Sequence, residues 1–353
     1  MIRDSTQKLV DGANLTYEES REVMKEIMSG QATNAQTAAL LTALRMKGET
    51  TEEIIAFAEI MKECSDRIRP RVNGRLIDTC GTGGDKIKTF NISTTAAFVV
   101  AGAGVAIAKH GNRSVTSQSG SADVLEKLGF NLDMTHEAVQ SSVEQVGIGF
   151  MFAPAFHPAM KYAIGPRREI GIRTIFNVLG PLTNPACANA QVLGVYDRKL
   201  TGPLAHALKS LGCEEAMVVH GLDGLDEIST VGKTAIAWLR KGEVNAIETV
   251  PKDFGVKHAR IAEIKGTTPD ENAEVLFKIL SGYCAVDDAK REIVLVNAAA
   301  GIIVGGKAED FSHGMELSRK SIDSGAAYKK LKTLIKASAG NLSKLEELES
   351  KYG

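Results

Sequence analysis

The sequence predicts an α/β protein in which a small N-terminal helical domain, residues 1–70, precedes a larger α/β domain, residues 71–353, with a mostly parallel sheet. Three observations predict this class. The chain has 353 residues, enough for about two domains that each bury a core. Helical periodicity fills the first seventy residues. From Arg71 onward, short apolar runs alternate with helical stretches, which is typical of a parallel α/β sheet.

Two capping boxes divide the opening into helices. Thr16 with Glu19, and later Thr50 with Glu53, place a hydroxyl residue three positions ahead of a glutamate, and apolar residues at helical spacing follow each pair. Between them runs the helix former NAQTAALLTALRMKG, which ends at Gly48, where we expect a left-handed cap. The opening is therefore predicted to be a helical bundle, which a returning helical segment near residues 167–190 joins.

The rest of the chain alternates between predicted strands and helices. The predicted strands are RLIDTC, VAIAKHG, AQVLGVY and AMVVHG, and TAIAWLRKGEVNAIETV predicts a β-hairpin. The predicted helices are TTAAFVVAGAG, ADVLEKLG, ENAEVLFKILSG and REIVLVNAAAGIIVGG, followed by a polar helical tail. These segments are expected to form the sheet and its covering helices.

Composition and charge give no support to several classes of protein. The formal net charge is −1, whereas a nucleic-acid-binding protein usually carries a basic surplus. The five cysteines form no CxxC pair, so neither a zinc knuckle nor a disulfide framework is indicated. The start of the chain lacks a signal-peptide pattern, and the apolar stretch Ala96–Ala108 is too short to span a membrane. We expect a soluble, cytoplasmic protein with no nucleic-acid or membrane partner.

The first candidate site is a glycine-rich loop between the strand RLIDTC and the next helix. Gly81, Gly83 and Gly84 let the backbone approach an anion closely, and their N–H groups with the helix N-terminus can cradle a phosphate. The loop matches neither GxGxxG nor GxxxxGK[ST]. A plain turn is the alternative, but it would need one glycine, and polar neighbours favour an anion site. These neighbours are Asp85, Thr89, Ser93 and Thr94.

The second candidate is AKHGNRSVTSQSGSADVLEKLG, another turn from strand to helix. Lys109, His110 and Arg113 offer cationic donors. A solvated polar loop is the alternative, yet so many small hydroxyl groups between two buried elements favour a polyanion. A ligand with two phosphate ends would satisfy both loops. The neutral donors are Asn112, Ser114, Thr116, Ser117, Ser119 and Ser121.

Two further clusters carry charge. Arg167, Arg168 and Arg173 gather where the chain returns to a helical segment. A surface helix commonly carries such arginines for solubility, but an arginine facing a cleft would hold a substrate carboxylate bidentately. Asp226 and Glu227 follow the strand AMVVHG. Adjacent carboxylates at the carboxyl end of a strand suit Mg²⁺ bound to phosphate oxygens, although such pairs are common on any surface.

Six segments together resemble the anthranilate phosphoribosyltransferases. They occur in that family's order and spread over most of the chain. Some members read PVR where this chain has GPR at Gly165–Arg167, and Gly171 and Arg173 fix the register in favour of Arg167. The segments are GTGGD (81–85), NIST (91–94), KHGNR (109–113), GSAD (120–123), FNVLGPLTNP (176–185) and the pair Asp226–Glu227.

The resemblance implies both fold and site. The fold would be similar to that of pyrimidine nucleoside phosphorylases, with the active site in the cleft at the hinge between the domains. Anthranilate contacts map onto Gly81, Asn112 and Arg167, and two Mg²⁺ sites map onto Ser93, Asp226 and Glu227. Lys109, Asp226 and Glu227 are the expected catalytic residues. The contacts to 5-phosphoribosyl 1-pyrophosphate map onto Gly81, Gly84, Asp85, Thr89, Asn91, Ile92, Ser93, Thr94, Lys109, His110, Gly111, Asn112, Arg113, Ser114, Val115, Thr116, Ser117 and Ser121.

The implied reaction builds charge on the departing pyrophosphate, so Mg²⁺ and fixed donors there are the main requirement. The amine of anthranilate carries its own lone pair and needs positioning more than deprotonation. Whether His110 has an acid–base role stays open. Two alternatives also stay open: a pyrimidine nucleoside phosphorylase on the same fold, and a non-enzymatic nucleic-acid-binding relative. Because a helical domain this small and apolar would leave an exposed face, we expect a homodimer through it.

Overall fold

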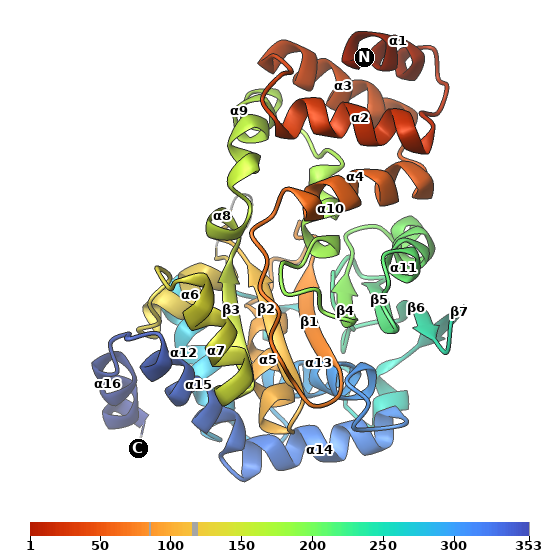
Figure 1. Cartoon of the computed structure of the whole chain (residues 1–353). Coiled ribbons are helices and arrows are strands. Elements are labelled where there is room, and N and C mark those ends of the chain that lie inside the picture. Colours follow the sequence, from red (N-terminus) through yellow and green to blue (C-terminus); the bar gives the residue numbers. More distant parts are fainter. Residues whose placement is uncertain (85, 115–118, 353) are drawn as a thin grey trace.

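The computed structural model describes residues 1–84, 86–114 and 119–352. A bundle of helices sits at one end of a seven-stranded sheet, and further helices cover both faces of that sheet (Figure 1). The predicted fold class, a helical domain joined to a mostly parallel α/β domain, is confirmed.

The bundle consists of α1 (Ile2–Val10), α2 (Tyr17–Met28), α3 (Asn34–Lys47) and α4 (Thr51–Glu63), joined by α9 (Lys161–Ile170) and α10 (Phe176–Leu182). α9 packs against α3 and α2, and α10 packs against α4. The capping boxes at Thr16 and Thr50 are both formed. Gly48 ends α3 with a positive φ of 88°, but its ψ of 131° lies outside the left-handed helical region, so the predicted left-handed cap is wrong in that respect.

The sheet has the strand order β3-β2-β1-β4-β5-β6-β7. The parallel strands are β1 (Leu76–Gly81), β2 (Ala106–Gly111), β3 (Ile148–Phe152), β4 (Ala190–Gly194) and β5 (Glu215–Gly221). β6 (Thr234–Arg240) and β7 (Glu243–Thr249) form the predicted hairpin and pair antiparallel at the edge. The sequence patterns predict neither β3 nor the helix before it, α7 (His136–Val146).

Two apolar cores lie on opposite faces of the sheet. Along β5, Met217 and Val219 belong to the core that contains α5 (Ile92–Gly102) and α13 (Ala289–Val304). Ala216 and Val218 belong to the other core, which contains α10, α11 (Thr201–Ser210) and the bundle. This alternation of successive side chains is the period of a strand buried on both faces. The second core therefore runs continuously from the sheet into the helical bundle.

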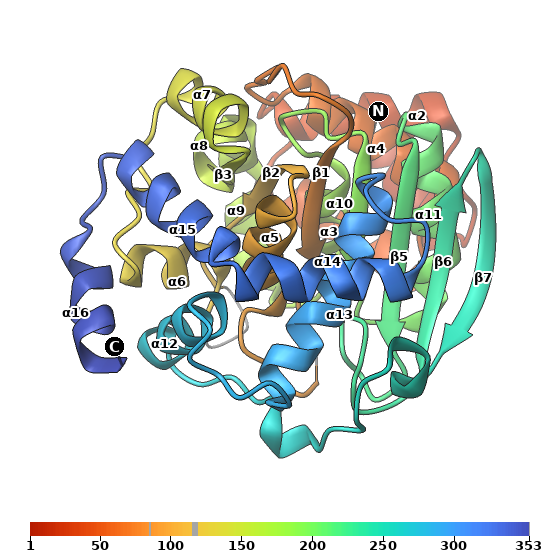
Figure 2. The same cartoon turned by 90° about the horizontal axis from the view of Figure 1, so that it is seen from below.

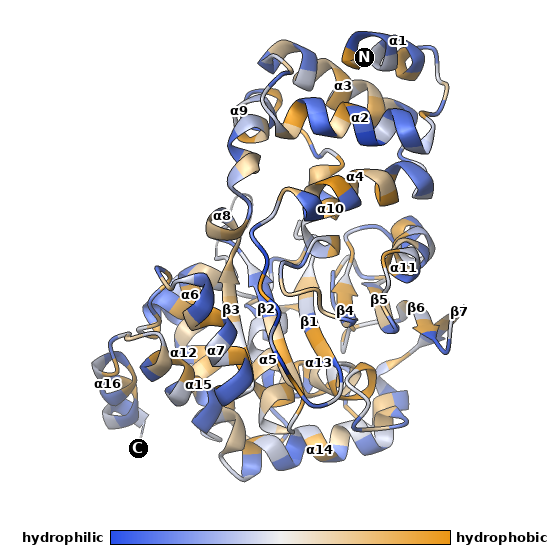
Figure 3. Cartoon of the chain, in the orientation of Figure 1, coloured by the Kyte–Doolittle hydropathy of each residue, from blue (hydrophilic) through white to orange (hydrophobic). Residues whose placement is uncertain are grey.

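The other helices complete the α/β domain. α5, α13 and α14 lie next to one another on one side of the sheet, as Figures 1 and 2 both show. Apolar colours concentrate on the strands, on α5 and on α13, and polar colours on the outer face of α2 (Figure 3). Among the described residues, no helix is long and apolar enough to cross a membrane. The remaining helices are α6 (Ser121–Lys127), α7 (His136–Val146), α8 (Ala153–Phe156), α12 (Pro269–Leu280), α14 (Phe311–Asp323), α15 (Ala326–Ala337) and α16 (Ser343–Tyr352).

Candidate active site at the carboxyl ends of the strands

The three predicted site loops all leave the sheet at the carboxyl ends of its parallel strands. The chain runs outward from β1 to β2 and β3, and then returns to place β4 on the other side of β1. In open α/β sheets, ligands bind outside the carboxyl ends of the strands at such a reversal of strand order. The glycine loop follows β1, the second polar loop follows β2, and the carboxylate pair follows β5, so all three border this position.

The carboxylate pair contacts the glycine loop and the start of α5. The Gly83 N–H donates to Asp226 Oδ2 at 3.0 Å, and the Ser93 N–H donates to Glu227 Oε1 at 3.1 Å. Both carboxylates are buried, each with 9% of its surface exposed. The three residues predicted to bind metal, which are far apart in the sequence, therefore lie within one hydrogen-bonded cluster.

Glycines permit this close approach. A Cβ at Gly81 would lie 2.6 Å from Asp226 Oδ2, and a Cβ at Gly194, the last residue of β4, would lie 1.6 Å from the Asp226 carbonyl oxygen. Gly83 and Gly84 have φ values of 69° and 83°, in the region that favours glycine. A side chain at Gly81 or Gly194 would therefore force Asp226 to shift.

Asn91 joins the two polar loops to each other. Its Nδ2 donates to the Ser119 carbonyl oxygen at 3.1 Å, while Asn272 of α12 donates to its Oδ1 at 3.3 Å. Asp123 of α6 accepts from the N–H groups of Ser114 and Gly120 at 3.0 and 2.8 Å, which shapes the ends of the second loop. Four of the predicted contacts lie outside the described residues, namely Asp85, Val115, Thr116 and Ser117.

Lys109 lies in β2, near its carboxyl end. It is only 4% exposed, and its Nζ donates to the carbonyl oxygen of Thr79 in β1. Burial lowers the pKa of Lys109, while the nearby Asp78 carboxylate acts in the opposite direction. Asp78 is itself fully buried and accepts from Asn184 Nδ2 at 2.7 Å. In this structure the ammonium group therefore contacts the backbone of β1.

The other residues predicted to contact phosphate differ in whether their side chains are available to a ligand. Arg113 pairs with Asp123 and Glu126 of α6 at 3.2 and 2.8 Å, so its guanidinium group is directed toward that helix. Ile92 and Thr94 are buried and can offer a ligand only their backbone. The Arg113 N–H donates to the side chain of Asn112, and Ser121 Oγ donates to the Asn112 carbonyl oxygen. Thr89 forms an isolated bridge with residue 265, and Gly111 ends β2.

Two histidines lie together near these strand ends. The ring centroids of His110 and His157 are 5.0 Å apart. Among the described residues, His110 Nε2 and both ring nitrogens of His157 are buried without a hydrogen-bond partner. Burial lowers the pKa of His110 to about 3 and that of His157 to about 4, so both rings are neutral at pH 7. His157 was not predicted, and no local motif marks it, because the fold brings it to His110.

The three arginines have different surroundings. Arg173 donates to the Gly84 carbonyl oxygen at 2.8 Å and lies over the ring of Tyr196, so it links the returning segment to the glycine loop. Arg168 is exposed. Arg167 is half-buried beside the ring of Phe176, and burial lowers its pKa. Within the described part of the chain, the Arg167 guanidinium has no ion-pair or hydrogen-bond acceptor, so it can receive an anion.

The donor set suits a hard cation. The described residues contain no group of three or more His, Cys, Asp or Glu side chains placed to hold a metal ion. Two carboxylates and the Ser93 hydroxyl supply only oxygen atoms, and Mg²⁺ typically takes one or two carboxylates and completes its shell with water and substrate phosphates. The set therefore fits Mg²⁺ that arrives with a phosphorylated substrate.

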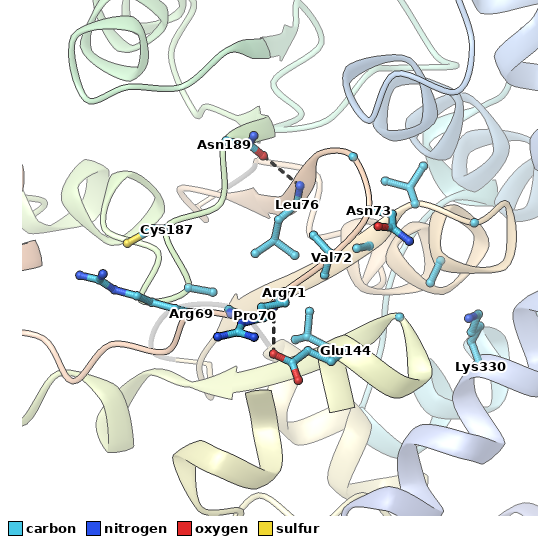
Figure 4. Close-up of a pocket in the computed structure, with 18 residues that line it drawn as sticks. Arg69, Pro70, Arg71, Val72, Asn73, Leu76, Glu144, Cys187, Asn189 and Lys330 are labelled. Atoms are coloured by element: carbon cyan, nitrogen blue, oxygen red, sulfur yellow. Dashed lines mark hydrogen bonds between the residues drawn. The ribbon is translucent and has the colours of Figure 1, made fainter. Parts of the chain in front are cut away.

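A separate cavity of about 870 Å³ lies at the opposite ends of the strands from the candidate site. It is bordered by residues 69–74 before β1 and by Leu76, together with Glu144, Cys187, Asn189 and Lys330 (Figure 4). Leu76 and Ala106 are the first residues of β1 and β2, so this cavity lies at the amino ends of the strands. It contains none of the predicted site residues and is distinct from the candidate site.

Comparisons with known proteins agree with this geometry. Residues 73–328 match the glycosyl transferase family a/b domain, and residues 3–65 match the helical bundle domain of that family. Anthranilate phosphoribosyltransferase of Pelotomaculum thermopropionicum is 52% identical over 97% of this chain and 98% of its own length. The crystal structure of the Thermus thermophilus enzyme superposes with a TM-score of 0.89 at 40% identity, over 95% of this chain and 99% of that one. The Saccharomyces cerevisiae enzyme, in complex with PRPP and Mg, gives 0.87 at 28% identity, over 96% and 98%. The chain belongs to the anthranilate phosphoribosyltransferase family.

Proposed function

We propose that this chain transfers the phosphoribosyl group of 5-phosphoribosyl 1-pyrophosphate to the amine of anthranilate, giving N-(5-phosphoribosyl)anthranilate and pyrophosphate in tryptophan biosynthesis. The observation that carries the proposal is the hydrogen-bonded cluster of the glycine loop, the start of α5 and the pair Asp226–Glu227. The relatives support the substrates, because Saccharomyces cerevisiae structures hold PRPP with Mg in one case and 4-fluoroanthranilate in another.

The departing pyrophosphate would lie against the glycine loop. In this structure the Gly83 and Ser93 N–H groups donate to Asp226 and Glu227, so the anion would be held by the remaining N–H groups of the loop and of the first turn of α5. Asp226 and Glu227 would hold Mg²⁺ through their oxygen atoms, with the Ser93 hydroxyl beside them. Bound there, Mg²⁺ would neutralise charge on the pyrophosphate as its bond to the ribose C1 breaks. The use of two ions per site stays a prediction.

The acceptor would be held by its carboxylate. We assign this contact to Arg167, because it is half-buried and has no acceptor among the described residues, whereas Arg173 is occupied by Gly84. The amine attacks with its own lone pair, so positioning is the main requirement. The rings of His110 and His157 are neutral, and they can offer hydrogen bonds but no cation. An acid–base role for His110 stays open.

Assembly also belongs to the proposal. Large apolar side chains are exposed on the helical bundle, with Met46 at 83%, Val10 at 66%, Ile164 at 45% and Tyr162 at 40%. An isologous dimer through the bundle would cover such a face. Light scattering of the purified chain at micromolar concentration tests this, and a monomer would contradict it. The domain division near residue 70 and the cytoplasmic location stay predictions.

One assay separates the proposed function from its alternatives. The purified chain is mixed with 5-phosphoribosyl 1-pyrophosphate and Mg²⁺, and pyrophosphate release is recorded with and without anthranilate. We expect release that depends on both anthranilate and Mg²⁺. Cleavage of a pyrimidine nucleoside by inorganic phosphate would instead indicate a nucleoside phosphorylase. Inactivity in both assays, with binding of nucleic acid, would indicate the non-enzymatic alternative. The named relatives support neither alternative.

A further inference from the structure

A side chain from α13 holds the backbone next to the carboxylate pair. Asp226 and Glu227 lie in the loop between β5 and β6, and Ile228 follows them. Asn297 Oδ1 accepts from the Ile228 N–H at 2.9 Å, and Asn297 Nδ2 donates to the Ile228 carbonyl oxygen at 3.0 Å. Both backbone groups of the residue after Glu227 are therefore bound by one amide, as they would be by a neighbouring strand.

The surroundings of Asn297 are otherwise apolar. Its side chain is 2% exposed, and its neighbours Val296 and Ala298 are fully buried. A buried amide is costly unless it is hydrogen-bonded, whereas an aliphatic side chain would fill the same space without that requirement. Both N–H donors of the amide are used, since Nδ2 also donates to the Ile293 carbonyl oxygen at 2.9 Å. The contacts of Asn297, more than its volume, therefore explain its presence in α13.

A second contact closes the same loop across its base. The Ser229 hydroxyl donates to Asp223 Oδ2, and the same hydroxyl oxygen accepts from the N–H groups of Val231 and Gly232 at 2.9 and 3.1 Å. Asp223 also accepts from the Leu225 N–H at 3.3 Å. The residues between Asp223 and Ser229, which include the carboxylate pair, therefore form a turn whose two ends are hydrogen-bonded to each other. Asn297 connects that turn to the core of the domain.

We propose that Asn297 is a positioning residue for the magnesium site. By binding the backbone of Ile228 it fixes the direction in which the Glu227 carboxylate leaves the chain, so that the carboxylate meets the first turn of α5. This inference rests on the proposed function, because it needs Asp226 and Glu227 to be the metal ligands. Loss of an outer partner of a metal ligand typically lowers metal affinity about 10–100-fold.

The test replaces Asn297 by leucine, which is similar in size and has no polar atoms. We expect Asn297→Leu to weaken binding of Mn²⁺ about 10-fold or more in the presence of 5-phosphoribosyl 1-pyrophosphate, measured as the enhancement of water-proton relaxation by the protein-bound ion. The Mg²⁺ concentration at half-maximal activity should rise by the same factor, while the rate at saturating Mg²⁺ recovers. If circular dichroism shows that this variant is unfolded, Asn297→Ala removes the same hydrogen bonds without added bulk and should show a shift of similar size.

A matched control separates metal positioning from simple loss of stability. Ser321 on α14 is also buried, 3% exposed, and its hydroxyl donates to the backbone of another helix, at Val99. Ser321→Ala should lower the melting temperature without changing Mn²⁺ binding. Parental Mn²⁺ affinity in the Asn297 variants, or an equal loss in Ser321→Ala, would overturn the inference.

The double variant Asp226→Asn with Glu227→Gln is measured in parallel. We expect it to lose Mn²⁺ binding. If it retains binding, the metal assignment itself is wrong, and the inference about Asn297 fails with it. If it loses binding while Asn297→Leu does not, only the positioning role fails.

Discussion

Gly194, at the end of β4, packs directly against the backbone of Asp226. The substitution Gly194→Ala tests whether this close packing positions the carboxylate. A Cβ at position 194 would lie 1.6 Å from the Asp226 carbonyl oxygen, where real contacts essentially never fall below 3.0 Å. The contacted atom belongs to the backbone, so a side-chain rotation cannot relieve the overlap. The Asp226 backbone would have to move away by about 1.4 Å in an interior that is close-packed.

The magnitude follows from that displacement. Misplacement of a reacting or binding group by about 1 Å can lower the rate about 100-fold. We therefore expect Gly194→Ala to lower kcat/KM about 100-fold, which corresponds to about 2.7 kcal/mol in transition-state stabilisation. Overpacking should also reduce the free energy of unfolding by about 1–3 kcal/mol.

The assay is the loss of anthranilate fluorescence in initial-rate measurements at several Mg²⁺ concentrations. The control is Gly202→Ala in α11, where an added Cβ would meet nothing within 4 Å. We expect this control to keep the parental rate. A folded Gly194→Ala protein whose kcat/KM lies within about threefold of the parent would refute the reasoning, because the displaced carbonyl would then have no effect on the site.

Four further variants address the rest of the site. Asp226→Asn with Glu227→Gln should abolish activity at ordinary Mg²⁺ levels and leave the circular dichroism spectrum unchanged; near-normal turnover would show that the metal lies elsewhere. Gly83→Val should strongly weaken binding of 5-phosphoribosyl 1-pyrophosphate in calorimetric titration, because φ is 69° at this position and a β-branched residue there is strained. Arg167→Ala should raise the KM for anthranilate about 10- to 100-fold, since a charge-assisted hydrogen bond contributes about 1.5–3 kcal/mol, with little change in the KM for the phosphoribosyl donor. Arg168→Ala should have little effect because its side chain is exposed, and a larger defect there would place the register one residue off.

Local signals predicted the parts of the fold that depend on neighbours in the sequence. The capping boxes at Thr16 and Thr50 could be predicted because each hydroxyl accepts from the backbone N–H three residues later. The glycine loop could be predicted from the sequence because three glycines follow a buried strand. The assignment of Ser93 and Glu227 to the same metal sites came from the family resemblance, since 134 residues separate them and no spacing rule connects them.

Contacts set by strand order were not predictable. Gly194 is a plain glycine at the end of a strand until β4 is placed beside β1 and near Asp226. Asn297 sits in a run of apolar residues, and its partner Ile228 is 69 positions away. His157 meets His110 only because β3 pairs with β2 and α8 follows β3. In each case the sheet determines the contact, and the residue type alone carries no signal.

The central claim is that the pyrophosphate and its metal bind where the glycine loop meets Asp226 and Glu227. Its most direct test is a crystal structure with 5-phosphoribosyl 1-pyrophosphate and Mn²⁺, in which the ion is located by its anomalous scattering. We predict an anomalous peak between the Asp226 and Glu227 carboxylates and the pyrophosphate, with phosphate oxygens accepting from the N–H groups of the glycine loop. A peak at the opposite ends of the strands, in the cavity bordered by residues 69–74 and Leu76, or a pyrophosphate remote from the carboxylate pair, would contradict the account.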